Sequence, residues 1–199
     1  AETVLLNLMR GTGLKGLCGV PPVRGNIIRP LIFCTREEVE EYCRSRGLSW
    51  VTDKTNLSTD YTRNKIRHII LPEMLKINGS LFSTMNRMEQ SLREDSDFLD
   101  DMARQALSEA ETTVRLRTPG EEDIWKLQPA WSAEKLAKLP KPVQSRAIKL
   151  ILQSGGIEPS ALRINNAREI IASGKGKFNP CRGKFFVVRR GAAYIEYAE

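Results

Sequence analysis

Hydrophobic residues repeat most regularly in the middle of the chain. Between residues 81 and 106, leucine, methionine and alanine recur at spacings of three, four or seven, and these spacings place them on one face of a helix. The pattern predicts a single amphipathic helix of about 27 residues, roughly 40 Å long. Its other face is acidic over residues 94–101, which is typical of a solvated helix face rather than of a metal site.

The residues before this helix predict short helices, turns and extended segments. We expect a helix over residues 1–9, a glycine-rich loop after it, and an extended stretch around residues 27–32. Thr35 and Glu38 form a capping-box pattern, in which each side chain binds the backbone amide of the other residue, so a helix should begin there. Residues 48–51 favour a short strand.

Further elements are expected before and after the long helix in the sequence. After a polar loop at residues 52–60, a helix with Ile66, Ile69 and Ile70 on one side should run towards Pro72. Beyond the long helix we expect a strand at 113–117, helices at 131–139, 142–154 and 160–172, and a terminal β-hairpin at 184–197. The chain therefore predicts a mixed α+β fold divided into residues 1–78 and a mainly helical part, residues 79–199, that carries a small sheet.

Length and composition are those of a globular chain with one or two domains. It has 199 residues, 41% hydrophobic and 28% charged, and no apolar run of about 18 residues that could span a membrane. It begins without a signal peptide, and because its first residues already have a helical pattern we expect a piece of a longer protein. Four cysteines without a C-x-x-C pair and a single histidine disfavour a zinc site and predict reduced thiols in the cytoplasm.

Positive charge is concentrated towards both ends of the chain. The formal net charge is +7, which divides into +5 over residues 1–88, −7 over residues 89–123 and +9 over residues 124–199. Basic surfaces attract polyphosphates because binding releases counterions, so nucleic acid is the first partner to consider. The alternative, solvated helix faces rich in lysine and arginine, stays open. Aromatic residues make up only 7% of the chain, which gives little support to a surface that stacks single-stranded bases.

The first candidate site is the loop after the first helix, with the sequence Arg10-Gly11-Thr12-Gly13. Glycines let backbone amides approach a phosphate or a base edge, and Arg10 adds a positive charge. The same residues also fit a helix C-cap followed by a turn. The loop alone therefore does not distinguish a ligand site from a simple chain reversal.

The second candidate site joins a polar loop to a helix start. Asp53 and Asn56 lie in the loop, and Thr-Arg-Asn-Lys-Ile-Arg-His opens the helix at residues 62–68. Arg63 and Arg67 are four residues apart, which places both on one helix face, where each guanidinium can bind a phosphate or carboxylate through two hydrogen bonds. The alternative is a plain helix start with solvated arginines.

Together these segments resemble a known enzyme family. The stretch AETVLLNLMRGTGLKGL resembles the sequence that follows the His-x-x-Asp-Asp element of the PP-loop ATP pyrophosphatases. RPLIFCTREEVEEYCRSRGLSWVTDKTNLSTDYTRNKIRHIILPEML resembles its continuation in the bacterial tRNA(Ile)-lysidine synthetases. The long helix, LPKPVQSRAIKLIL and the terminal GKFFVVRRGAAYIEY resemble the middle, substrate-binding domain of that family. The Asp-x-x-Asn and Thr-Arg-Asn-x-x-Arg elements are the most specific part of the resemblance.

The resemblance implies a fold and a reaction. Residues 1–78 would be the C-terminal part of an α/β nucleotide-binding PP-loop domain, and residues 79–199 a tRNA-binding domain. The family is an ATP- and Mg²⁺-dependent ligase that adenylates C2 of the wobble cytidine of tRNA(Ile) with a CAU anticodon. The side-chain amine of free lysine then displaces AMP and leaves lysidine. The family's Ser-Gly-Gly-x-Asp-Ser loop and its His-x-x-Asp-Asp element would precede Ala1, so ATP and Mg²⁺ would bind mainly outside this chain, which should be inactive alone.

The resemblance also implies roles for single residues. Arg67 should stabilise negative charge on the α-phosphate and the departing pyrophosphate, and Glu2 should bind the ammonium group of lysine. Asn56 should contact lysine or orient Arg67, and the loop at residues 10–13 should lie near the nucleotide or the target cytidine. The remaining residues expected to contact substrate or tRNA are Asp53, Arg63, Asn64 and His68.

Two other functions fit parts of the sequence. A non-enzymatic tRNA- or RNA-binding module would account for the charge, but it gives no reason for Glu2, Asn56 and the two arginines to lie in one neighbourhood. A relative that thiolates tRNA would need cysteine pairs or an iron–sulfur site, which the cysteine spacing does not offer. The enzyme and the binding module differ in whether residues 2, 10–13, 56, 63 and 67 converge on one cleft. The oligomeric state stays open, a homodimer included.

Overall fold

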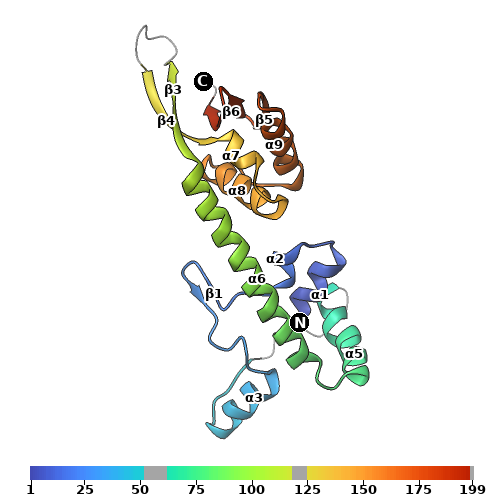
Figure 1. Cartoon of the computed structure of the whole chain (residues 1–199). Helices are drawn as coiled ribbons and strands as arrows, with labels where there is room; N and C mark the ends of the chain where they lie inside the picture. Colours follow the sequence, from blue (N-terminus) through green and yellow to red (C-terminus); the bar gives the residue numbers. More distant parts are fainter. Residues whose placement is uncertain (52–61, 118–124, 198–199) are drawn as a thin grey trace. The chain divides into compact units, whose positions relative to one another are not determined.

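The computed structural model describes residues 1–51, 62–117 and 125–197. The chain divides into two compact units, Ala1–Ser96 and Asp97–Glu199. The division falls inside helix α6 (Leu81–Ala110), which is shared by both units (Figure 1). The boundary that we expected from the sequence, between residues 78 and 79, lies close to the start of this helix and not inside it. With 30 residues, α6 is about 45 Å long, and the long amphipathic helix predicted from the hydrophobic spacing is confirmed.

The described part of unit 1 is built from short helices and a small β-hairpin. Residues 48–51 were expected to form a strand but do not form one. Among the described residues of unit 1, the two strands of the hairpin pair only with each other. The elements before α6 are α1 (Glu2–Met9), α2 (Leu14–Leu17), β1 (Val23–Arg24), β2 (Ile27–Ile28), α3 (Arg36–Ser45), α4 (Thr62–Lys65), the π-helical turn η2 (Ile66–Ile70) and α5 (Leu71–Ile77).

Helix α3 begins at the predicted capping box. The Thr35 hydroxyl accepts a hydrogen bond from the Glu38 amide at 3.2 Å, and the Glu38 carboxylate accepts one from the Thr35 amide at 2.6 Å. Both amides would otherwise lack a partner in the first turn of the helix. Local sequence is therefore sufficient to set the start of α3.

Helix α1 packs at the centre of the unit 1 core. Its buried Val4 lies in one cluster with Ile66 of η2, Leu71 of α5, and Leu81 and Met85 of α6. Burying side chains of this size stabilises a fold by about 1.5–3 kcal/mol each. The cluster therefore fixes the first turn of α1 against η2, although some 60 residues separate the two segments in the sequence.

Only one of the three isoleucines expected on one side of the helix is buried in unit 1. Ile66 is fully buried, whereas Ile69 and Ile70 are exposed. Ile66 begins the π turn η2, whose hydrogen bonds close at five residues, so the expected α-helical spacing is interrupted here.

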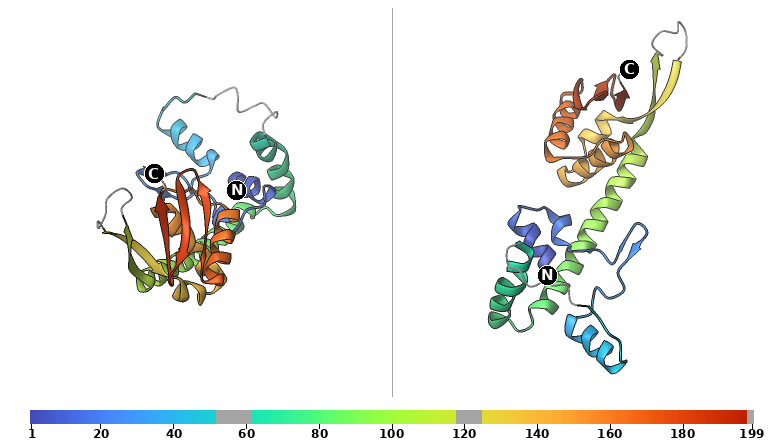
Figure 2. Two further views of the ribbon diagram at one scale, coloured as in Figure 1. Left: turned by 90° about the horizontal axis from the view of Figure 1, so that it is seen from above. Right: turned by 180° about the vertical axis from the view of Figure 1, so that it is seen from behind.

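The described part of unit 2 combines a five-stranded antiparallel sheet with three helices after α6. The strand order is β3-β4-β7-β6-β5, and Figure 2 shows the C-terminal strands side by side. No helix among the described residues is long and apolar enough to cross a membrane. The elements are β3 (Glu111–Arg117), β4 (Trp125–Ser132), α7 (Ala133–Ala137), α8 (Lys141–Ser154), α9 (Ala161–Ser173), β5 (Gly176–Cys181), β6 (Lys184–Arg189) and β7 (Ala192–Tyr197).

Both faces of this sheet carry apolar side chains. Alternate residues of a strand point to opposite faces, and Phe186 and Ile195 accordingly pack in the large cluster formed with α7, α8 and α9. Val187 and Tyr194 point the other way and pack with Leu116 and other residues of the β3–β4 hairpin. The predicted helices and terminal hairpin of unit 2 are confirmed, whereas β4 and β5 were not predicted.

The unit 2 core yields a stability prediction with a matched control. Leu136 is fully buried and Leu162 is 70% exposed. Replacing Leu136 by alanine removes buried methylene contacts and leaves a cavity, which should cost about 3 kcal/mol of unfolding free energy. Leu162→Ala should change it by less than about 0.5 kcal/mol. Urea unfolding of both variants measures the difference, and equal midpoints would contradict the assigned core.

Candidate functional site

Unit 1 contains a cleft of about 1010 Å³. The start of α1, the residues that lead into α3, the η2–α5 helix and the first half of α6 all contribute to its walls. Charged and titratable side chains from several of these elements line it, among them Glu2, Arg67, His68, Glu89 and Arg93. The cleft therefore gathers groups from distant parts of the sequence that could bind a charged ligand.

The most specific contact in the cleft joins Glu2 to Arg67. Arg67 Nε donates to Glu2 Oε1 at 2.5 Å, and Arg67 Nη2 donates to Glu2 Oε2 at 3.0 Å. Two parallel hydrogen bonds of this kind fix the guanidinium plane as well as its position. The side chains are 38% and 25% exposed. The hydrogen bonds to Glu2 raise the pKa of Arg67 above its ordinary value, so its positive charge is retained.

Arg63 lies beside this pair and contacts the same turn of α1. Its Nη2 donates to Thr3 Oγ1 at 3.3 Å, and its Nε lies 3.8 Å from Glu2 Oε2. The Arg63 side chain is 54% exposed. We refer to Glu2, Thr3, Arg63 and Arg67 as the arginine cluster. With two guanidinium groups and one carboxylate it carries one net positive charge, which suits an anionic ligand.

The sequence around the arginine cluster explains how it forms. Thr3 is followed by the buried Val4, and Arg67 is preceded by the fully buried Ile66. These two apolar residues belong to the same core cluster, so their polar neighbours are brought together at its edge. Arg67 is also part of the π turn η2, and such turns occur frequently at functional sites.

The α6 side of the cleft holds the end of the glycine-rich stretch. Arg93 Nη2 donates to the carbonyl oxygens of Cys18 at 2.6 Å and Val20 at 3.4 Å. Between them, Gly19 has a φ of +66°, and a Cβ at this position would lie 2.2 Å from Glu89 Oε2. The positive φ favours glycine here, and a larger residue would also require the Glu89 side chain to move.

The predicted loop at residues 10–13 lies at the opposite end of α1 from the arginine cluster. The amides of Arg10 and Gly11 donate to the carbonyls of Asn7 and Leu8 at 3.1 and 3.0 Å, and Gly11 has a φ of +73°. This is a helix C-cap followed by a turn. No residue of 10–13 is among those that line the cleft, and α1 separates the loop from the arginine cluster by about 12 Å. Of the residues expected to converge on one cleft, Glu2 and Arg67 line it, Arg63 contacts Glu2 and Thr3, and this loop does not line it.

The other predicted residues have different positions. Asp53 and Asn56 lie outside the described residues. Asn64 is buried, so its side chain is directed into unit 1 rather than towards an RNA surface, and His68 lines the cleft. Sequence reasoning missed Thr3 and Arg93. Thr3 was open to prediction because it follows Glu2 in the same helical turn, whereas the contact of Arg93 depends on how α6 packs.

The described residues offer no evident site for a metal ion. Within residues 1–51, 62–117 and 125–197, no group of three histidine, cysteine or carboxylate side chains could hold one. Mg²⁺ requires oxygen ligands in near-octahedral geometry, and the single carboxylate of the arginine cluster is already paired with Arg67. The part of the cleft described here therefore fits an anion and does not fit Mg²⁺.

Known proteins share sequence with most of this chain. Residues 1–74 match the family model of the PP-loop domain. Over 182 residues, or 88% of the chain, the sequence is 32% identical to the tRNA(Ile)-lysidine synthase of Geobacillus kaustophilus, and over 160 residues, or 76%, it is 34% identical to that of Bacillus subtilis. The chain belongs to the tRNA(Ile)-lysidine synthase family. The predicted family resemblance and the α+β fold class are confirmed.

The sequence matches extend over both units of this chain, but they cover only part of the length of each relative. The PP-loop match includes all four residues of the arginine cluster, and the match to the Geobacillus kaustophilus synthase extends well into unit 2. The synthase of Caldanaerobacter subterraneus is 50% identical over 103 residues, which is half of this chain. The chain spans 37% and 31% of the lengths of the Geobacillus and Bacillus synthases, about a third, and 22% of the length of the Caldanaerobacter synthase.

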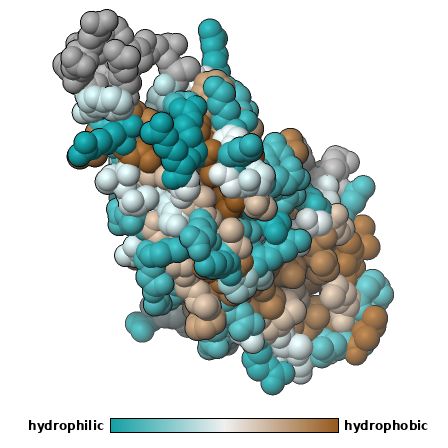
Figure 3. Space-filling model, turned by 45° about the horizontal axis from the view of Figure 1, so that its top comes forward, coloured by the Kyte–Doolittle hydropathy of each residue, from teal (hydrophilic) through white to brown (hydrophobic). Residues whose placement is uncertain are grey.

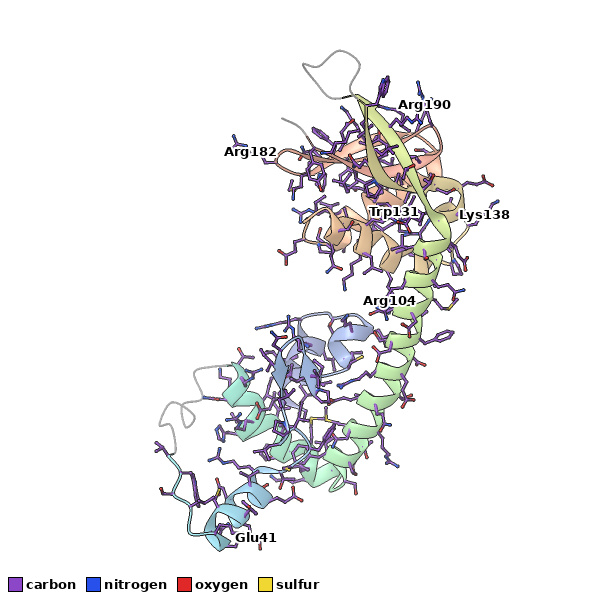
Figure 4. The ribbon with its side chains drawn as sticks, turned by 90° about the vertical axis from the view of Figure 1, so that its left-hand side faces the viewer. Glu41, Arg104, Trp131, Lys138, Arg182 and Arg190 are labelled. Atoms are coloured by element: carbon purple, nitrogen blue, oxygen red, sulfur yellow. The ribbon has the colours of Figure 1, made fainter. Side chains whose placement is uncertain are left out.

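Unit 2 of this family member carries a basic surface on its C-terminal strands. No acidic residue occurs between Glu169 and Glu196. Figure 4 shows Arg182 and Arg190 pointing outward on opposite sides of unit 2, and Figure 3 shows hydrophilic and hydrophobic areas side by side on one face of the molecule. Lys177 Nζ lies 5.0 Å from the centre of the Phe185 ring. We refer to the exposed basic residues of these strands and the segments beside them as the basic strand surface: Lys175, Lys177, Arg182, Arg189 and Arg190.

Proposed function

We propose that this chain is part of an ATP-dependent ligase that converts the wobble cytidine of tRNA(Ile) to lysidine. The observation that carries the proposal is the arginine cluster, which lies within the residues that match the PP-loop domain. Its Glu2, Thr3 and Arg67 line the cleft. Relatives over most of the chain are named tRNA(Ile)-lysidine synthases. ATP, free lysine and tRNA(Ile) with a CAU anticodon are the proposed substrates, and the cytoplasm is the proposed compartment.

The charge of the cluster suits the first step of this reaction. Adenylation of C2 of the cytidine develops negative charge on the α-phosphate and on the departing pyrophosphate. Fixed cations that are already oriented stabilise such charge without having to reorganise during the reaction. Arg67 is held in a single orientation by two hydrogen bonds, so we assign it this role, with Arg63 in support.

The remaining assignments rest on the family resemblance. Asp53 and Asn56 would orient the arginines or contact lysine, and His68 would contact substrate in the cleft that it lines. Arg10, Gly11, Thr12 and Gly13 would meet the nucleotide or the RNA at the far end of α1. Mg²⁺ would accompany ATP, and because the described residues do not fit it, no step is assigned to it here.

The basic strand surface supports a role of unit 2 in holding the tRNA. Its lysines and arginines are mostly exposed, and no carboxylate lies near them in the sequence to neutralise them. Contacts to phosphates position an RNA without reading its sequence. We therefore assign the basic strand surface to the tRNA backbone and assign the chemistry to unit 1.

The role of Arg67 can be tested in the full-length protein that carries this chain. Arg67→Ala should reduce lysidine formation at least about a hundredfold, because an oriented cation contributes roughly 3 kcal/mol to a charged transition state. Arg44→Ala, which removes an exposed arginine from α3, should leave turnover within about twofold. Incorporation of labelled lysine into a tRNA(Ile) transcript measures both. Near-normal turnover of a folded Arg67→Ala variant would contradict the assignment.

The role of the basic strand surface can be tested by the salt dependence of tRNA binding. Each phosphate contact contributes about 0.9 to the slope of log affinity against log salt, so replacing both Arg182 and Arg190 by alanine should lower that slope by nearly 2. The control variant replaces Arg104 and Lys138 by alanine. These substitutions remove the same charge from unit 2, but the two residues are paired with Asp101 and Glu134. Electrophoretic binding at several salt concentrations measures the slopes, and equal slopes for the two variants would contradict the assignment.

A further inference from the structure

Consecutive residues in the first turn of α1 hold the two arginines of the cluster. Glu2 accepts both hydrogen bonds from Arg67 at 2.5 and 3.0 Å, and Thr3 accepts one from Arg63 at 3.3 Å. Thr3 also lines the cleft beside Glu2 and Arg67. One turn of helix α1 therefore sets the direction of both guanidinium groups.

The geometry of Glu2 ties its carboxylate to the two arginines. Each of its carboxylate oxygens accepts a hydrogen bond from Arg67, and Arg63 Nε lies 3.8 Å from one of them. A lysine ammonium at Glu2 would therefore share the carboxylate with a guanidinium that the fold holds in place through the neighbouring buried Ile66. The resemblance alone had suggested lysine as the partner of Glu2.

We propose that Glu2 and Thr3 are positioning residues, which orient Arg67 and Arg63 towards the anionic group of the reaction. This inference rests on the proposed function, because it takes the arginines as the groups that meet the phosphates. Glu2 acts through Arg67, and Thr3 acts through Arg63. Neither residue touches the reacting atoms.

The physical basis is the flexibility of the arginine side chain. A free arginine samples many rotamers, and ordering it while the substrate binds lowers its contribution to the transition state. Glu2 and Thr3 supply that order in advance, and the cluster still keeps one net positive charge for the substrate. The hydroxyl of Thr3 is essential to this arrangement because a hydrocarbon group of the same shape cannot accept a hydrogen bond.

The first test compares two substitutions of Thr3 in the full-length protein. Thr3→Val keeps the shape but removes the acceptor, and it should lower kcat for lysidine formation about tenfold, the loss expected for one hydrogen bond to a charged group. Thr3→Ser keeps a hydroxyl and should restore kcat to within about twofold of the original. Thr84→Val makes the same chemical change on α6 outside the cleft and should leave kcat unchanged. Equal kcat values for Thr3→Val and Thr3→Ser would overturn the role of Thr3.

The second test separates positioning by Glu2 from lysine binding by Glu2. The amide of Glu2→Gln offers one acceptor oxygen in place of two, so kcat should fall about tenfold while KM for lysine stays within about twofold. Glu2→Asp, which keeps the charge on a shorter side chain, is measured alongside. A rise in KM for lysine of about tenfold or more with kcat unchanged would overturn the positioning role and favour an ammonium site.

The two levels of the account fail in different ways. If the original protein forms no lysidine, or if Arg67→Ala retains full activity, the proposed function fails. If Arg67→Ala and Arg63→Ala lose activity while Thr3→Val and Glu2→Gln keep full kcat, the proposed function stands and the positioning role is overturned. Thermal unfolding of each variant identifies any loss of activity that comes from loss of the fold.

Discussion

The paired hydrogen bonds between Glu2 and Arg67 are the interaction on which this account depends. They connect the first turn of α1 to the π turn η2 across 65 residues of sequence, and the buried Val4 and Ile66 directly beside them keep the two segments in contact. An exposed ion pair stabilises a protein little, so the value of this one lies in orientation rather than in stability. A half-exposed, oriented guanidinium next to a cleft is suited to meeting an anion.

The two units of the chain differ in the size of their cores and in the arrangement of their charged side chains. Unit 1 has a small core of residues from α1, η2, α5 and α6, and its polar edge carries the arginine cluster. Unit 2 has a larger core between its sheet and α7, α8 and α9, and its exposed lysines and arginines lie at the ends of the C-terminal strands and on β5. Specific contacts in unit 1 suit a reaction that needs fixed geometry, and dispersed charge in unit 2 suits the backbone of an RNA.

Much of the fold was predictable where one physical signal dominates. The spacing of apolar residues predicted α6, and Thr35 with Glu38 predicted the start of α3, because both signals are local. The π turn was not predictable, since the pattern of Ile66, Ile69 and Ile70 equally fits an α-helix, and β4 was missed because Pro129 and the polar residues near it obscure its alternation. In the site, Glu2, Arg63 and Arg67 were singled out from the sequence, whereas the hydrogen bonds between Glu2 and Arg67 depend on tertiary packing that the sequence does not display.

A double-mutant cycle on Glu2 and Arg67 tests the central claim most directly. Glu2→Gln, Arg67→Lys and the double variant are compared in the full-length protein by the single-turnover rate at which the wobble cytidine is adenylated. If Glu2 acts only through Arg67, the double variant should be no more than about twofold slower than the slower single variant, because contacting residues are not additive. Effects that multiply, so that the double variant loses the product of the two single losses, would show that Glu2 and Arg67 act independently and would contradict the account.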